Sequence, residues 1–308
     1  MPGELSKDTR ARLILAVLFA VSILNFVDRQ ILAILAGKVK ADLLISDAQL
    51  GFLYGTVFGI FYAAFGVPLG VYADLGSRRK LIAWGLALWS LMTAASGLAT
   101  GFSSLALARV GVGVGEASAS PAAYSLLADL FPRARRGTAL GIYSLGIYVG
   151  IGLSSYLGGT VVDAWSAAFL PGREPFGLRG WQAAFLIAGL PGLLLVPLVL
   201  SFREPERGAL EEMPVAPPRG GSPGALRSAL REGLALMPPF SLFFLRRDSV
   251  PVARNAGALA ACLVGAASLW LAFGDPIQWA CVAVGLYVVA TLAQRLRVRE
   301  PDAFALIF

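Results

Sequence analysis

Eight long apolar segments follow one another along this chain. They cover residues 12–36, 50–73, 81–100, 103–127, 137–160, 181–202, 255–273 and 276–294. A helix needs roughly 20 apolar residues to cross a hydrocarbon layer of about 30 Å, whereas a strand of a transmembrane barrel needs only about 10. The segments therefore predict an all-α, polytopic membrane protein. Composition agrees, because 57% of the 308 residues are hydrophobic and 15% are charged, unlike an ordinary soluble domain.

Basic residues gather in alternate loops. They precede the first segment and fill the loops after the second, fourth, sixth and eighth, at Lys7, Arg10, Arg12, Arg78, Arg79, Lys80, Arg133, Arg135, Arg136, Arg203, Arg254, Arg295, Arg297 and Arg299. The opposite loops hold few basic residues, so the positive-inside rule predicts a cytoplasmic N-terminus. The same rule accounts for the net charge of +7 without a nucleic acid partner. Arginine far outnumbers lysine, and together with the many Ala and Gly residues this indicates a bacterial inner membrane.

The chain divides into three parts by composition. Residues 1–205 hold six apolar segments, residues 206–254 form a linker rich in Pro, Gly and charge, and residues 255–308 hold the last two segments and the chain end. Within the linker, the leucines and arginines of 225–247 are typical of a helix that lies at the membrane surface, although an ordinary linker helix fits nearly as well. The apolar run at 303–308 resembles the approach to another span.

Five polar or charged residues fall inside the apolar segments. Asn25, Asp28 and Arg29 lie close together on one side of the first helix. Arg109 and Glu116 lie two helical turns apart in the fourth segment. Such residues are costly in a bilayer and are functional candidates by default. At about 1.5 Å per residue, Asp28 and Arg109 reach similar depths, so an ion pair between them is geometrically possible, and Glu116 falls near or below the midplane. The alternative is a static network that only joins the two helices.

Other site chemistry is scarce. The chain has no histidine, so proton chemistry must use carboxylates. Cys262 and Cys281 have no partners at metal or redox spacing, and no nucleophile setting is recognisable, so we expect no metal, no cofactor and no enzyme. The glycines of 111–115 lack the strand and spacing of a dinucleotide-binding loop, and like Gly146 and Gly150 they suit close helix packing.

The loop between the second and third segments carries a specific motif. A glycine, an aspartate four residues later and a basic pair occupy a short turn: Gly70, Asp74, Arg78 and Arg79. This pattern resembles the signature loop of the major facilitator superfamily, with Ser77 where that family usually has glycine. The resemblance implies that the acid and the two arginines form a charge-relay latch that stabilises one access state.

Further stretches resemble the spinster-type branch of that superfamily. They are Asn25–Arg29, Ser46–Gly51, Arg109–Glu116, Asp129–Pro132 and Arg136–Ala139, within a similarity that covers residues 12–205. The resemblance implies a six-helix half over residues 1–205, two additional helices over 255–308, and a second six-helix half that is absent from this chain.

Spinster-type proteins are thought to be proton-coupled exporters or uniporters of lipid-like molecules, such as sphingosine phosphate and lysophospholipids. For this chain the resemblance implies that Asp28 and Glu116 respond to protons. Arg29 and Arg109 would then be their partners, or contacts for an anionic head group.

We therefore expect a secondary transporter of a small amphipathic or anionic solute that works by alternating access in the lipid bilayer, with proton coupling. Two alternatives stay open. One is a drug or sugar-phosphate carrier from another branch of the superfamily, and the other is a non-transporting membrane scaffold built on half a carrier. Nothing in the sequence fixes an oligomeric state.

Overall fold

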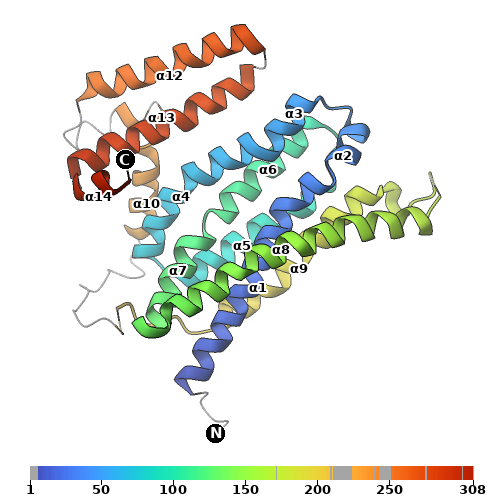
Figure 1. Ribbon diagram of the computed structural model, residues 1–308, viewed down its shortest axis with the longest axis horizontal. Helices are drawn as coiled ribbons and strands as arrows, with labels where there is room; N and C mark the ends of the chain where they lie inside the picture. Colours follow the sequence, from blue (N-terminus) through green and yellow to red (C-terminus); the bar gives the residue numbers. More distant parts are fainter. Residues whose placement is uncertain are drawn as a thin grey trace.

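The computed structural model describes residues 6–170, 172–208, 210, 224–238, 240–242, 251–274, 276–299 and 301–307. This part of the chain contains helices and turns and no strand. Six helical segments are long and apolar enough to cross a membrane: Lys7–Ile34, Asp47–Leu75, Arg133–Ala168, Gly180–Ser201, Val252–Phe273 and Trp279–Val298. The predicted all-α, polytopic class is confirmed (Figure 1).

The first six apolar segments form one bundle of slanted helices (Figure 1). Its helices are α1 (Lys7–Ile34), α4 (Val57–Leu75), α5 (Arg78–Ser96), α6 (Phe102–Glu116), α7 (Ala119–Leu130), α8 (Arg133–Ala168) and α9 (Gly180–Ser201). The shorter elements between them are α2 (Ala36–Leu43), α3 (Asp47–Gly51), η1 (Phe52–Thr56) and η2 (Pro175–Gly177). Because α3 and η1 run on into α4, the second apolar segment is one continuous helical span.

Two of the eight expected spans differ from the prediction. Only residues 81–96 of the third segment lie in α5, which already begins at Arg78, and residues 103–127 are split between α6 and α7. The split has a local cause. Ser118 turns its hydroxyl back to donate a hydrogen bond to the carbonyl of Gly115 at 2.7 Å. Pro121 has no N–H to offer the carbonyl four residues earlier. Glu116 is therefore the last residue of α6, beside a break in the helix.

Two apolar layers fill the bundle, one after the other along the helices. Along α1 the layers meet between Val21 and Val27, and along α6 they meet between Leu105 and Val112. Arg109 lies at this junction and is fully buried. The buried polar residues therefore occupy a level between two well-packed apolar regions.

Helix α8 holds the middle of α1 at close range. A Cβ atom at Gly150 would lie 2.6 Å from the carbonyl oxygen of Ile23, and Gly146 makes a similar approach one turn earlier. Ser154, one turn further on, donates a hydrogen bond to the carbonyl of Val27 at 3.1 Å. The close packing predicted for these glycines thus fixes the part of α1 that carries its charged residues.

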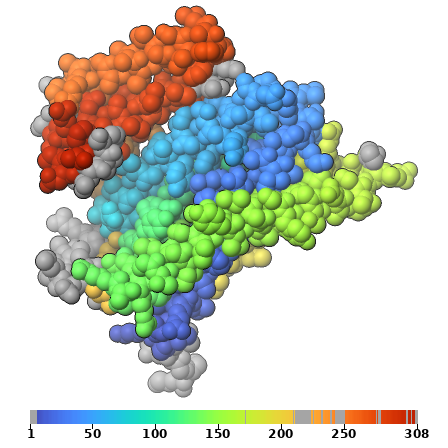
Figure 2. Space-filling model, in the orientation of Figure 1, coloured from blue at the N-terminus to red at the C-terminus, as the bar shows by residue number. Residues whose placement is uncertain are grey.

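The last helices form a hairpin beside the bundle (Figures 1 and 2). α12 (Val252–Phe273) and α13 (Pro276–Arg299) run antiparallel, and α14 (Pro301–Ile307) follows. α13 faces α4, whereas α12 lies on the outside of the hairpin (Figure 2). The buried hydroxyl of Tyr287 ties the hairpin together, since it accepts from Nδ2 of Asn255 at 2.8 Å and bonds the Ser241 hydroxyl at 2.6 Å.

One helix of the expected linker is described, α10 (Gly224–Leu234), and it lies against α4. It covers the first part of the segment 225–247 that predicts a surface helix. The linker residues 209, 211–223, 239 and 243–250 lie outside the described part of the chain.

Candidate functional site

Arg29 of α1 and Glu116 of α6 form an ion pair inside the bundle. Nη2 of Arg29 lies 2.7 Å from Oε2 of Glu116, and Nε lies 3.1 Å from the same oxygen. The Glu116 side chain is 0% exposed, whereas the Arg29 side chain is 26% exposed. The pair is therefore accessible from the arginine side.

Three aromatic rings surround the Arg29 guanidinium. Its Cζ atom lies 4.8 Å from the ring centre of Phe26, 4.7 Å from that of Phe58 and 5.0 Å from that of Tyr62. Cation–π attraction stabilises a guanidinium at these distances, most strongly where water is scarce. Phe58 also lies 5.3 Å from Cζ of Arg109. The site thus combines one accessible cation with apolar ring faces.

Asp28 and Arg109 are fully buried beside each other. Nη1 of Arg109 donates to the backbone carbonyl of Asp28 at 3.3 Å, whereas neither carboxylate oxygen of Asp28 has a hydrogen-bond partner among the described residues. Trp89 and Thr93 of α5 are polar neighbours of this carboxyl group, and their side-chain donors are also unpaired. The two groups meet as their depths predict, but through the backbone and not as a side-chain ion pair.

The five residues that the sequence singled out therefore form one cluster. Asn25 lies beside Glu116, and its amide nitrogen has no hydrogen-bond partner among the described residues. Unpaired buried polar atoms cost about 1–3 kcal/mol each, and more when charged. The two carboxyl groups thus have different surroundings: Glu116 is bonded to an arginine, while the oxygens of Asp28 are unbonded. Such a difference suits two separate roles.

A second network lies at the basic end of the bundle, the end that carries residues 78–80. Arg78 is fully buried. It donates to Oε1 of Glu204 at 2.9 Å, to the Ser125 hydroxyl at 2.9 Å and its carbonyl at 3.1 Å, to the Pro205 carbonyl at 3.0 Å, and to the Asp129 carboxylate. One side chain thereby joins the start of α5, the end of α7 and the segment after α9.

Glu204 collects further bonds from the turn before α5. It accepts from the Ser77 hydroxyl at 2.7 Å and from the backbone N–H of Arg78 at 3.0 Å. Burial by itself raises the pKa of the Glu204 carboxyl, but the hydrogen bonds from Ser77 and Arg78 outweigh it and hold the pKa below its usual value. Ser77 also caps α5 by accepting from the Lys80 N–H. The serine that departs from the family pattern therefore has a structural role here.

Two arginines of the same network donate hydrogen bonds to carbonyl groups at the ends of helices. Nη1 of Arg79 donates to the carbonyls of Leu200 and Phe202 at 2.9 and 2.8 Å, at the end of α9. Nη2 of Arg207 donates to the carbonyl of Ala73 at 2.5 Å, near the end of α4. Cations at these positions satisfy terminal carbonyls and complement the helix dipole.

The other two motif residues make no hydrogen bond or ion pair in this network. Asp74 is exposed and forms neither with a described residue, although its negative charge acts on Arg207. Nothing lies within 4 Å of the Cβ position at Gly70. The acids that pair with Arg78 are Asp129 and Glu204, for which the sequence predicted no role. A signal was available, since both acids stand where an apolar segment gives way to a basic loop.

The chain is similar to carriers of several kinds. It is 34% identical to an MFS-type efflux pump of Mycolicibacterium smegmatis over 208 residues, which is 68% of this chain and 44% of that protein. It is 35% identical to protein spinster homolog 1 of Homo sapiens over 255 residues, 81% of this chain and 45% of that protein. It is 26% identical to a probable L-galactonate transporter of Escherichia coli, with 74% and 48% covered. The chain thus spans about half the length of the curated relatives it matches.

The fold resembles that of a solved bacterial homolog of the human lysosomal transporter Spinster, in an inward-facing and occupied conformation. The TM-score is 0.63 at 27% identity, with 96% of this chain and 77% of that chain covered. The predicted resemblance to the spinster-type branch is therefore confirmed. A sequence profile described as Major Facilitator Superfamily matches residues 18–294. With that match, its apolar helices and this fold, the chain is an integral membrane protein that belongs to the major facilitator superfamily.

Proposed function

We propose that this chain forms part of a secondary transporter that moves a small amphipathic or anionic organic solute by alternating access, with proton coupling. The solute class is lipid-like, such as a sphingoid base derivative or a lysophospholipid. The basic loops favour a cytoplasmic N-terminus. The excess of arginine over lysine, with the many Ala and Gly residues, favours a bacterial inner membrane.

The unpaired carboxyl group of Asp28 carries the proton-coupling part of this proposal. An ionised carboxylate that is buried and forms no hydrogen bond is costly, so a change in its surroundings is readily linked to proton uptake or release. Arg109 lies close enough to respond, because it is bonded to the backbone of the same residue. In this proposal Asp28 exchanges the proton and Arg109 senses its charge.

The surroundings of Arg29 support the solute class. Its guanidinium is partly exposed and already bonded to Glu116, so an anionic head group would compete with that carboxylate for the same donors. The rings of Phe26, Phe58 and Tyr62 offer apolar faces next to it. In this proposal the head group binds at Arg29, Asn25 and Glu116 adjust to it, and an apolar tail follows the rings.

The network of Arg78 supports alternating access. It links three elements at the basic end through one buried side chain. In this proposal Arg78 and Arg79 hold the half together in one access state, as the family motif implies. We also keep Asp74 and Gly70 in the proposed latch. The Asp74 carboxylate is exposed and the space beside Gly70 is open, so both positions are free to form contacts in the other access state.

A second candidate is a carrier of anionic sugar derivatives or drugs. Relatives at 26–34% identity include proteins named as an efflux pump, a probable L-galactonate transporter and a hexuronate transporter. The same arginine would serve a carboxylated or phosphorylated sugar. A substrate panel of lysolipids, sugar phosphates and sugar acids in proteoliposomes separates the two candidates. Absence of uptake for every member would favour the non-transporting scaffold.

The proton-coupling proposal is tested in proteoliposomes with an imposed pH gradient. Asp28→Asn should abolish gradient-driven uptake while solute exchange without a gradient is retained. Asp163→Asn, which changes an exposed carboxyl group on α8, serves as the matched control and should behave like the unmodified protein. Gradient-driven uptake that survives Asp28→Asn would overturn the assignment.

A further inference from the structure

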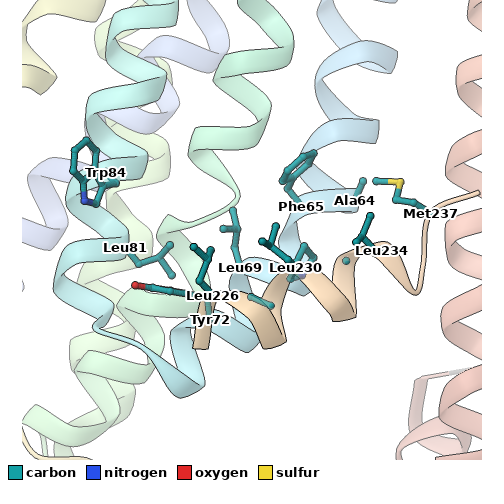
Figure 3. Close-up of a pocket in the computed structure, with 13 residues that line it drawn as sticks. Ala64, Phe65, Leu69, Tyr72, Leu81, Trp84, Leu226, Leu230, Leu234 and Met237 are labelled. Atoms are coloured by element: carbon teal, nitrogen blue, oxygen red, sulfur yellow. The ribbon is translucent and has the colours of Figure 1, made fainter. Parts of the chain in front are cut away.

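An apolar groove lies between α4, α5 and α10, and its lining includes no residue of the charged cluster. It has a volume of about 410 Å³. Helix α10 crosses the ends of α4 and α5 there and forms the floor of the groove (Figure 3). Its lining includes Phe65 and Leu69 of α4, Trp84 of α5, and Leu226 and Leu230 of α10 (Figure 3). Apart from the Tyr72 hydroxyl and the Trp84 indole N–H, the lining side chains are apolar.

The position of α10 is fixed by close packing on α4. A Cβ atom at Gly233 would lie 3.0 Å from Cβ of Pro68, so the two backbones approach closely at this point. Ala229 of α10 is buried in the same contact region. The helix thus lies firmly on α4 while its leucines stay available on the groove side.

Large apolar side chains of the groove are exposed. Trp84 is 75% exposed, and Leu226 and Leu230 are 59% and 57% exposed. Exposed apolar patches of this kind mark a binding or membrane-facing surface. Tyr72 lies near the end of α4, and Leu81 directly follows the basic residues 78–80 at the start of α5. The groove therefore opens at the basic end of the bundle, where we expect the spans to leave the membrane.

Basic side chains stand beside the leucines. Arg227 and Arg231 each directly follow a groove leucine and lie about 100° further around the same helix. Both are exposed, and no described carboxylate forms an ion pair with either. A leucine row with an adjacent arginine row is the pattern of a helix that lies in the membrane interface and attracts anionic lipid.

We propose that this groove binds an anionic phospholipid of the membrane. One acyl chain lies along Leu226, Leu230 and the ring of Trp84, and the phosphate is held by Arg227 and Arg231. The charge complementarity selects an anionic lipid over a zwitterionic one. This site is distinct from the proposed solute site and does not depend on transport.

Trp84 provides a local reporter for the test. The protein and its Trp84→Phe variant are reconstituted in phosphatidylcholine vesicles that contain a fixed minor fraction of phosphatidylglycerol. In one set of vesicles the acyl chains of the phosphatidylglycerol are brominated. In the other set the phosphatidylglycerol is unmodified, and an equal amount of the phosphatidylcholine has brominated acyl chains. The difference in fluorescence between the two proteins isolates Trp84. We expect brominated phosphatidylglycerol to quench Trp84 more strongly than brominated phosphatidylcholine.

Charge variants then locate the head group. The double substitution Arg227→Gln with Arg231→Gln should abolish the preference for phosphatidylglycerol. Arg203→Gln with Arg254→Gln removes the same charge from exposed positions outside the groove and should retain it. The proposal is wrong if both brominated lipids quench Trp84 equally, or if neither quenches it. It is also wrong if the preference for phosphatidylglycerol survives the substitution of Arg227 and Arg231, or if the substitution of Arg203 and Arg254 removes it equally. Gel filtration and circular dichroism confirm that each variant is folded.

Discussion

Arg29 and Glu116 differ in the solvent access and the contacts that each keeps when the other side chain is removed. Glu116 is fully enclosed, whereas Arg29 keeps partial exposure and its aromatic rings. Removing one partner of a buried ion pair costs about 3–5 kcal/mol, so we expect Arg29→Met to lower the unfolding free energy by that amount. Glu116→Gln should cost only about 1–2 kcal/mol, because the amide can still accept a hydrogen bond. Denaturation in detergent micelles measures both.

The double variant tests whether the pair acts as a unit. Its loss of unfolding free energy should be smaller than the sum of the single losses, because no charge is left unpaired. Arg12→Met is the control, since the Arg12–Asp8 pair on the same helix is mostly exposed and should contribute less than about 1 kcal/mol. Strictly additive losses at 29 and 116 would show that the pair does not stabilise the bundle.

At the scale of helices, the contact between α1 and α8 depends on glycine. Gly150→Ala would place a methyl group 2.6 Å from the Ile23 carbonyl oxygen and 2.7 Å from Cβ of Phe26, so the helices must separate. We expect a loss of about 1–3 kcal/mol in unfolding free energy. Gly152→Ala on the same helix meets nothing within 4 Å and should change it by less than about 1 kcal/mol. Equal effects in thermal unfolding would contradict this packing.

The same elements show what a sequence can and cannot predict. Six of the eight expected spans, and the packing role of Gly150, followed from hydrophobic runs and small residues. The partner of Glu116 did not, because a rise of about 1.5 Å per residue gives depth but not the rotation of a helix about its axis. Depth alone predicted that Arg109 lies beside Asp28. The contact between Arg29 and Glu116 depends on how α1 and α6 are rotated, which the packing of the helices determines. The break after Glu116 was detectable from Pro121, which cannot bond the carbonyl four residues back.

At the scale of the whole molecule, the two polar networks lie at different levels of one bundle. The cluster around Asp28 lies between two apolar layers, and the network around Arg78 closes the basic end. The second network joins segments of the chain as distant as residues 77 and 204. These bonds hold the start of α5, the end of α7 and the segment after α9 together. We therefore expect the network around Arg78 to contribute measurably to the free energy of unfolding of the bundle.

Glu204 makes this stability depend on pH. Its pKa in the folded protein lies below its unfolded value of about 4.3, because the hydrogen bonds from Ser77 and Arg78 outweigh the effect of burial. The contribution of Glu204 to the unfolding free energy is therefore complete above the unfolded pKa and is lost as the pH falls through the lower folded pKa.

We expect Glu204→Gln to lower the unfolding free energy by about 2 kcal/mol near neutral pH. The difference in unfolding free energy from the unmodified protein should shrink below about pH 4.5. Thermal unfolding in detergent between neutral and acidic pH measures this. Glu206→Gln, at an exposed acid in the same segment, is the control and should leave the unfolding free energy near neutral pH almost unchanged. A Glu204→Gln penalty that stays constant into acid would mean that the ionised carboxylate does not hold the basic end together.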